Sequence, residues 1–143
     1  RVFGEMVDLL VQRGEGGAAV AVERLWNDLA ETRDFSLLCG YRLDVFDGAV
    51  QAGTLPHICS SHSHVLPARN YPRFARAVDE ALREVLGASE AASIYVRVSR
   101  EAARGESSHV PLAQLLLMWV TENMPRHAAR VLDTTRLRYA TAA

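Results

Sequence analysis

Residues 1–7 of the chain read Arg1-Val2-Phe3-Gly4-Glu5-Met6-Val7, and the interpretation of the whole sequence starts from them. Val2 and Phe3 have the composition of a short strand, and Gly4 ends it before an apolar helix opens at Glu5. The strand has neither a cap nor a polar lead-in. We therefore expect a chain that begins inside a core sheet and has lost its front half.

A second apolar stretch, Phe35–Tyr41, has the clearest strand pattern in the chain. The spacing of apolar residues predicts two helices before it, over Glu5–Gln12 and Ala18–Thr32. The first 41 residues therefore follow the order βααβ. Because this second strand is apolar on both faces, we expect a parallel sheet covered on both sides. The expected fold class is α/β, with a partial parallel sheet.

The pattern changes after residue 67. A helix is expected between a cap at Asn70 and a stop at Gly87, with Pro72 in its first turn. Residues 89–104 have some strand composition, but helical spacing is favoured. Further helices are expected over Pro111–Met124 and Arg126–Ala140. The sequence thus predicts an α/β part over residues 1–67 and an all-helical C-terminal region over residues 68–143.

Composition and length indicate a globular protein with one core. The chain has 143 residues, of which 49% are hydrophobic, which is too many for a disordered chain. The longest apolar run, Leu115–Val120, is too short to cross a bilayer, and no signal peptide is present. A cytoplasmic location without membrane association is expected.

Charge gives little sign of a nucleic-acid partner. All sixteen basic residues are arginine, and the net charge is −1. Residues 1–67 hold five arginines and nine acidic residues, for a net charge of −4, and the remainder of the chain has a net charge of +3. The halves could attract each other or a partner. Nucleic-acid binding is not expected.

Three histidines and one cysteine gather between residues 57 and 64. Imidazole and thiolate are ligands for zinc and similar metals, so a metal-dependent hydrolase is one alternative function. The spacing does not converge on one point, and buried hydrogen bonding or helix capping explains it better. The four candidate ligands are His57, Cys59, His62 and His64. Cys39 and Cys59 are expected as buried thiols rather than as a disulfide.

Glu5 follows the first strand, at the expected carboxyl edge of the sheet. Ligands of open α/β sheets collect outside that edge, so Glu5 is a candidate ligand-binding residue, although it could instead complement the helix dipole. The phosphate-binding loops G-x-x-x-x-G-K-[ST] and G-x-G-x-x-G are absent, and the chain has no lysine. No cofactor is expected.

Four motifs in order resemble the MEDS domain, the sensory domain of methanogen and methylotroph regulators of the dichloromethane-regulator type. The resemblance covers residues 1–67, and residues 68–143 match no family. The motifs are Arg1-Val2-Phe3-Gly4-Glu5-Met6-Val7, Leu25-Trp26-Asn27-Asp28-Leu29, Phe35-Ser36-Leu37-Leu38-Cys39-Gly40-Tyr41 and Cys59-Ser60-Ser61-His62-Ser63-His64-Val65-Leu66-Pro67.

The resemblance implies a RecA/KaiC-like core that has lost nucleotide hydrolysis. It implies a sensory, non-catalytic function in which a small, hydrocarbon-derived ligand or a signalling partner is bound. Partners of such domains are histidine kinases or other regulator modules. The candidate ligand-binding residues that follow are Glu5, Trp26, Cys39, His62 and His64, with Cys59 as a further family-typical residue.

Two expectations concern self-association. A half-sheet exposes strand edges, so a homodimer that completes the sheet is expected. The other alternative is a pure interaction module, in which helices dimerise through Leu115, Leu116 and Trp119.

Overall fold

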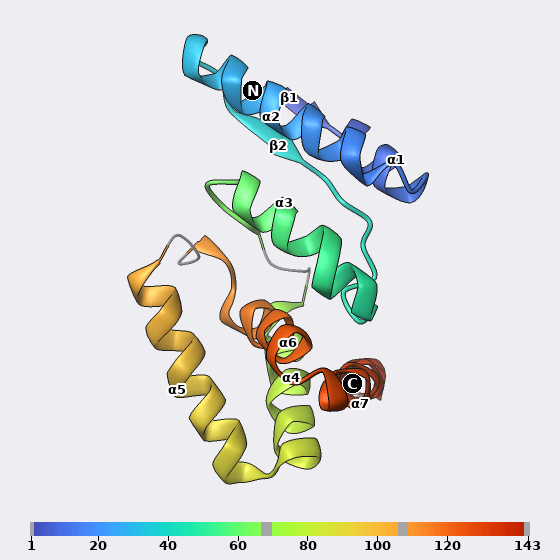
Figure 1. Cartoon of the computed structure of the whole chain (residues 1–143), viewed down its shortest axis with the longest axis vertical. Coiled ribbons are helices and arrows are strands. Elements are labelled where there is room, and N and C mark those ends of the chain that lie inside the picture. The colour runs from blue at the N-terminus through green and yellow to red at the C-terminus, as the bar shows by residue number, and fades with distance from the viewer. Residues whose placement is uncertain (1, 67–69, 106–108, 142–143) are drawn as a thin grey trace. The chain divides into compact units, whose positions relative to one another are not determined.

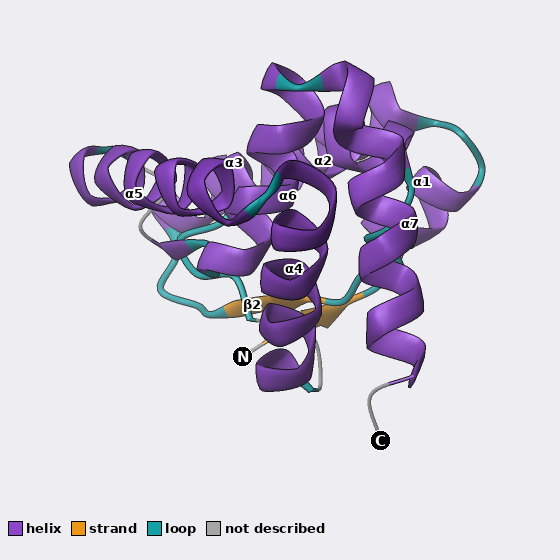
Figure 2. Ribbon diagram, turned by 90° about the horizontal axis from the view of Figure 1, so that it is seen from below, coloured by secondary structure: helices purple, strands orange, loops and turns teal. Residues whose placement is uncertain are grey.

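The computed structural model describes residues 2–66, 70–105 and 109–141, which fold into two compact units, Arg1–Asp44 (unit 1) and Val45–Ala143 (unit 2). A boundary near residue 67 was expected. That position lies outside the described residues, and the contacts of the chain divide instead after Asp44. Each unit is described by itself (Figures 1 and 2).

Unit 1 has the predicted βααβ order. Its elements are β1 (Val2–Gly4), α1 (Met6–Gln12), α2 (Gly16–Thr32) and β2 (Leu37–Cys39). The strands pair in parallel, with Phe3 opposite Leu38 and Gly4 opposite Cys39. Gly14 separates the two helices with a φ of 76°, a left-handed conformation that favours glycine. Both helices lie on one side of the strand pair (Figures 1 and 2).

The predicted RecA/KaiC-like α/β fold is wrong. Such a core needs a parallel sheet of several strands with helices on both faces, whereas the sheet of the described residues has two strands of three residues each. The expected strand over Phe35–Tyr41 is shorter than its apolar run. The segment after it forms η1, a π-helix over Val50–Thr54, and α3 (Leu55–Ser61) instead of further strands. The chain is a mostly helical protein.

The secondary-structure elements of unit 2 within its described residues are all helices. After η1 and α3 come α4 (Tyr71–Leu86), α5 (Ala88–Arg104), α6 (Leu112–Asn123) and α7 (Pro125–Thr141). The helical spacing favoured for residues 89–104 is therefore confirmed by α5. Within the described residues, no helix is both long enough and apolar enough to cross a membrane.

The core of unit 2 forms where the apolar stripes of these helices meet. Val78 and Leu82 of α4 are fully buried, as are Leu116 of α6 and Val131 of α7. The buried side chains of Gln51 and Gln114 pair across 2.9 Å, which satisfies polar groups that would otherwise be costly in an apolar interior.

Candidate functional site

The two parallel strands of unit 1 bring their carboxyl ends to one edge of the sheet. The amide of Gly40 donates to the carbonyl of Gly4 across 3.1 Å, so Glu5 and the residues after Cys39 leave the sheet side by side. Glu5 caps α1 without a side-chain hydrogen bond, and its side chain is exposed. Two candidate residues, Glu5 and Cys39, therefore do lie at the edge where ligands of parallel sheets collect.

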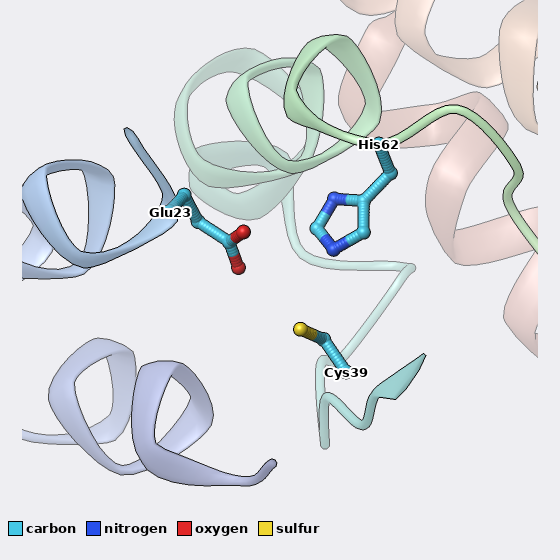
Figure 3. Close-up of side chains that lie close together, drawn as sticks. All are labelled: Glu23, Cys39 and His62. Atoms are coloured by element: carbon cyan, nitrogen blue, oxygen red, sulfur yellow. The ribbon is translucent and has the colours of Figure 1, made fainter. Parts of the chain in front are cut away.

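Three side chains of unit 1, Glu23, Cys39 and Tyr41, form what we term the carboxyl-edge cluster. The hydroxyl of Tyr41 donates to Oε1 of Glu23, which is only 4% exposed. Figure 3 shows the Glu23 carboxylate, carried by α2, and the Cys39 thiol, at the end of β2, pointing into a common space. His62, also labelled there, belongs to unit 2 and is described below.

The surroundings of the cluster keep the Cys39 thiol and the Tyr41 hydroxyl protonated. Burial raises the pKa of the Cys39 thiol, and the charge of Glu23 raises it further. The hydrogen bond between Cys39 and Tyr41 lowers this pKa by a smaller amount. Burial raises the pKa of Tyr41 far above its usual range, and the bond to Glu23 raises it further. Both groups are protonated near neutral pH, so they act as hydrogen-bonding groups rather than as nucleophiles.

A second polar contact fixes the chain as it leaves the sheet. Asp8 of α1 is 2% exposed, and it accepts hydrogen bonds from the backbone N–H of Arg42 at 2.7 Å and from its Nε at 3.2 Å. Gln12 donates to the same carboxylate at 2.6 Å. Burial works against the charge of Asp8, but these bonds and the Arg42 charge outweigh it and lower the pKa of Asp8.

The face of the sheet that points away from α1 and α2 is apolar. Phe3 and Leu38 are register partners, so their side chains share this face, and they are 62% and 52% exposed. The Phe3 ring lies over Gly40, where an added Cβ would sit 3.3 Å from the ring. We call Phe3 and Leu38 the bare sheet face. The prediction that the second strand is covered on both sides is wrong for Leu38.

Of the other candidate ligand-binding residues, Trp26 belongs to unit 1, whereas His62 and His64 belong to unit 2. Trp26 is on α2. Its ring contacts the ring of Phe35, which precedes β2, in an edge-on arrangement with the ring centroids 6.1 Å apart. Trp26 therefore does not lie at the carboxyl edge of the unit 1 sheet. In unit 2, His62 follows α3 and its Nδ1 is 2.7 Å from the carbonyl of Ile58. His64 is exposed, with Nδ1 3.2 Å from the Ser63 hydroxyl.

The candidate metal ligands around α3 do not converge. His57 is exposed, whereas Cys59 is buried, and burial raises the pKa of the Cys59 thiol to about 11. In the described part of the chain, no three of His57, Cys59, His62 and His64 bring ligand atoms together. The residues are close in sequence, but only His57 and Cys59 lie on α3, where His57 is exposed and Cys59 is buried.

Sequence patterns did not reveal four of the residues described above. Glu23 and Asp8 are acidic residues on amphipathic helices, which usually face water, and Tyr41 and Arg42 were assigned to the end of a strand and a loop. One feature of the sequence could have pointed to Asp8. It stands between the apolar residues Val7 and Leu9, and Gln12 follows four residues later. Its main partner is 34 residues away, a distance that local patterns do not bridge.

Removing the charge of Glu23 should make Cys39 more reactive. In a Cys59→Ser background, Glu23→Gln lowers the pKa of the Cys39 thiol because the charge of Glu23 helps to raise it. We expect iodoacetamide to alkylate Cys39 severalfold faster at neutral pH. Glu31→Gln, an exposed change on the same helix, is the control. Equal rates for all three proteins would contradict the account of the cluster.

Comparison with known proteins adds no relative: no family model, no curated protein and no solved structure matches the chain.

Proposed function

We propose that the chain is a non-catalytic sensory module that binds a small, hydrocarbon-derived ligand at the bare sheet face of unit 1. The observation that carries the proposal is the exposure of Phe3 and Leu38 beside each other on the uncovered side of the sheet. Exposed apolar surface is costly in water, and contiguous apolar patches on a protein mark sites where something binds.

The apolar character of unit 1 extends beyond this pair. Seven large apolar side chains of this 44-residue unit are more than 40% exposed, compared with three in the described residues of the 99-residue unit 2. The unit 1 residues are Val2, Phe3, Met6, Leu9, Leu25, Leu29 and Leu38. Apolar exposure is therefore concentrated in the smaller unit, which supports recognition by that unit.

The side chains near the sheet edge favour binding over chemistry. The thiol of Cys39 and the phenol of Tyr41 are protonated, and the Cys59 thiol is as well. A nucleophile needs a lowered pKa or an adjacent base that takes its proton. The dispersed histidines around α3 give no support to a metal-dependent hydrolase.

The signalling partner of the module is proposed from the family resemblance. A histidine kinase or another regulator module would read the bound state. A pure dimerisation module built on Leu115, Leu116 and Trp119 is less well supported. Leu116 is fully buried and Leu115 is 9% exposed, so neither offers surface to a partner.

Binding of the neutral apolar dye Nile red to the full chain tests the proposal. We expect the dye's emission to rise with the wild-type protein, and Phe3→Ser with Leu38→Ser to reduce that rise at least twofold, because the exposed apolar surface they supply is lost. The control is Leu25→Ser, which removes a side chain that is 66% exposed on α2.

Circular dichroism establishes that all variants are folded. If Leu25→Ser reduces the emission as much as the paired change, the dye does not discriminate the bare sheet face and the proposal fails. Loss of binding only in the paired variant supports it.

A further inference from the structure

One face of α5 carries three arginines, Arg97, Arg100 and Arg104. Their spacing of three and four residues places them on one side of the helix, and all three are exposed. Figure 1 shows α5 at the outside of the unit 2 helices. An open depression of about 650 Å³ follows this side, and it is also lined by Ser93 and Val96. We call this surface the α5 arginine face.

The charge of the α5 arginine face is not neutralised within the described part of unit 2. Two other exposed arginines of unit 2 have acidic partners: Arg83 lies 2.9 Å from Asp79, and Arg138 lies 2.6 Å from Glu84. None of the described carboxylates lies within ion-pair distance of the three α5 arginines. The Arg97 guanidinium instead stacks 5.4 Å from the ring centroid of Trp119, which positions it on the surface.

The complementary surface is on α2 of unit 1. Leu25 and Leu29, one turn apart, are 66% and 42% exposed. The exposed acids Asp28 and Glu31 flank them. Unit 1 holds five arginines and eight acidic residues, for a net charge of −3, whereas unit 2 holds eleven arginines and nine acidic residues, for a net charge of +2. An acidic helix with an apolar stripe is the kind of partner that the α5 arginine face fits.

We propose that the α5 arginine face of one copy binds α2 of a second copy. Leu25 and Leu29 would cover Val96, which is 50% exposed, and Asp28 and Glu31 would pair with Arg97 and Arg100. The two surfaces differ, so the contact is head-to-tail. This inference rests on charges and exposure outside the bare sheet face, and is therefore independent of the proposed ligand site.

An acidic protein helix fits the α5 arginine face better than a nucleic acid does. Val96 adds apolar surface to the depression, which the apolar stripe of a helix can cover and a phosphate backbone cannot. The chain as a whole has a net charge of −1, so no long-range field draws nucleic acid. A contact made by one helix face on each copy is expected to be weak and sensitive to salt.

Sedimentation velocity of the full chain tests the contact, over a range of protein concentrations at about 0.02 M and about 0.5 M salt. We expect the average mass to rise with concentration at low salt only. Arg100→Glu and Asp28→Arg should each abolish that rise. Mixing the two variants should restore association, because the unaltered α5 of the Asp28→Arg copy can bind the unaltered α2 of the Arg100→Glu copy. Arg130→Glu, an exposed change on α7, is the control.

Three results would overturn the proposal. One is a wild-type mass that does not depend on concentration at low salt. Another is failure of the mixed variants to associate while circular dichroism reports both as folded. The third is binding of a short DNA duplex that Arg100→Glu abolishes while Asp28→Arg leaves self-association unchanged, which would assign the arginines to nucleic acid.

Discussion

Replacing Leu116 by alanine is expected to lower the free energy of unfolding of unit 2 by about 3 kcal/mol. Leu116 lies on α6 and is 0% exposed in the core of unit 2. The substitution removes three buried carbon atoms and leaves a cavity that the surrounding helices only partly fill. The matched control is Leu137→Ala on α7. Its side chain is 61% exposed, so its loss should change stability by no more than about 0.5 kcal/mol.

Urea unfolding followed by tryptophan fluorescence measures this effect. Each unit contains one of the two tryptophans, Trp26 in unit 1 and Trp119 in unit 2. In a Trp26→Phe background, the signal therefore reports on unit 2 alone. Equal unfolding midpoints for Leu116→Ala and Leu137→Ala would mean that α6 does not form the core described here.

Replacing Asp8 by alanine is expected to destabilise unit 1 by about 2 kcal/mol or more. The change leaves the Arg42 backbone N–H without the carboxylate that accepts it at 2.7 Å, and the Arg42 side chain loses its ion pair. Fluorescence of Trp26 in a Trp119→Phe background measures the loss. Asp34→Ala, an exposed change between α2 and β2, is the control, and a similar loss there would contradict the assigned role of Asp8.

The same carboxylate predicts how the stability of unit 1 depends on pH. The pKa of Asp8 is lower in the folded chain than its ordinary value of 3.8. Its contribution to stability is therefore fully present above that value, and it is lost as the pH falls through it towards the folded-state pKa. The stability difference between wild type and Asp8→Asn should shrink below about pH 4. A difference that stays constant down to pH 2 would show that Asp8 is not stabilised as an anion.

Local patterns predicted the elements of unit 1 because the apolar residues there follow helix and strand periods. Val2–Gly4 and Leu37–Cys39 are strands, and their parallel pairing is as expected. The extent of the sheet was not predictable in this way. An apolar run such as Phe35–Tyr41 does not indicate whether a second layer of helices exists to cover it. The exposed Leu38 contradicts the inference that such a layer is present.

The candidate site was predictable only in part. Glu5 and Cys39 follow from the rule that parallel strands end at one edge. Glu23 was not predictable, because its partner Tyr41 is 18 residues away and beyond the second strand. His57 on α3 and the two histidines that follow this helix, His62 and His64, attracted attention through their density in sequence. A helix turns by about 100° per residue, so density in sequence does not bring ligands together in space.

The central claim is that unit 1 recognises apolar groups at the bare sheet face. It is tested most directly by following backbone amide resonances of the full chain while n-hexanol is added. The account predicts that the largest shifts fall on Phe3, Leu38 and Gly40 and saturate together. Shifts that are spread evenly over the exposed apolar side chains, or that centre on α5, would contradict it.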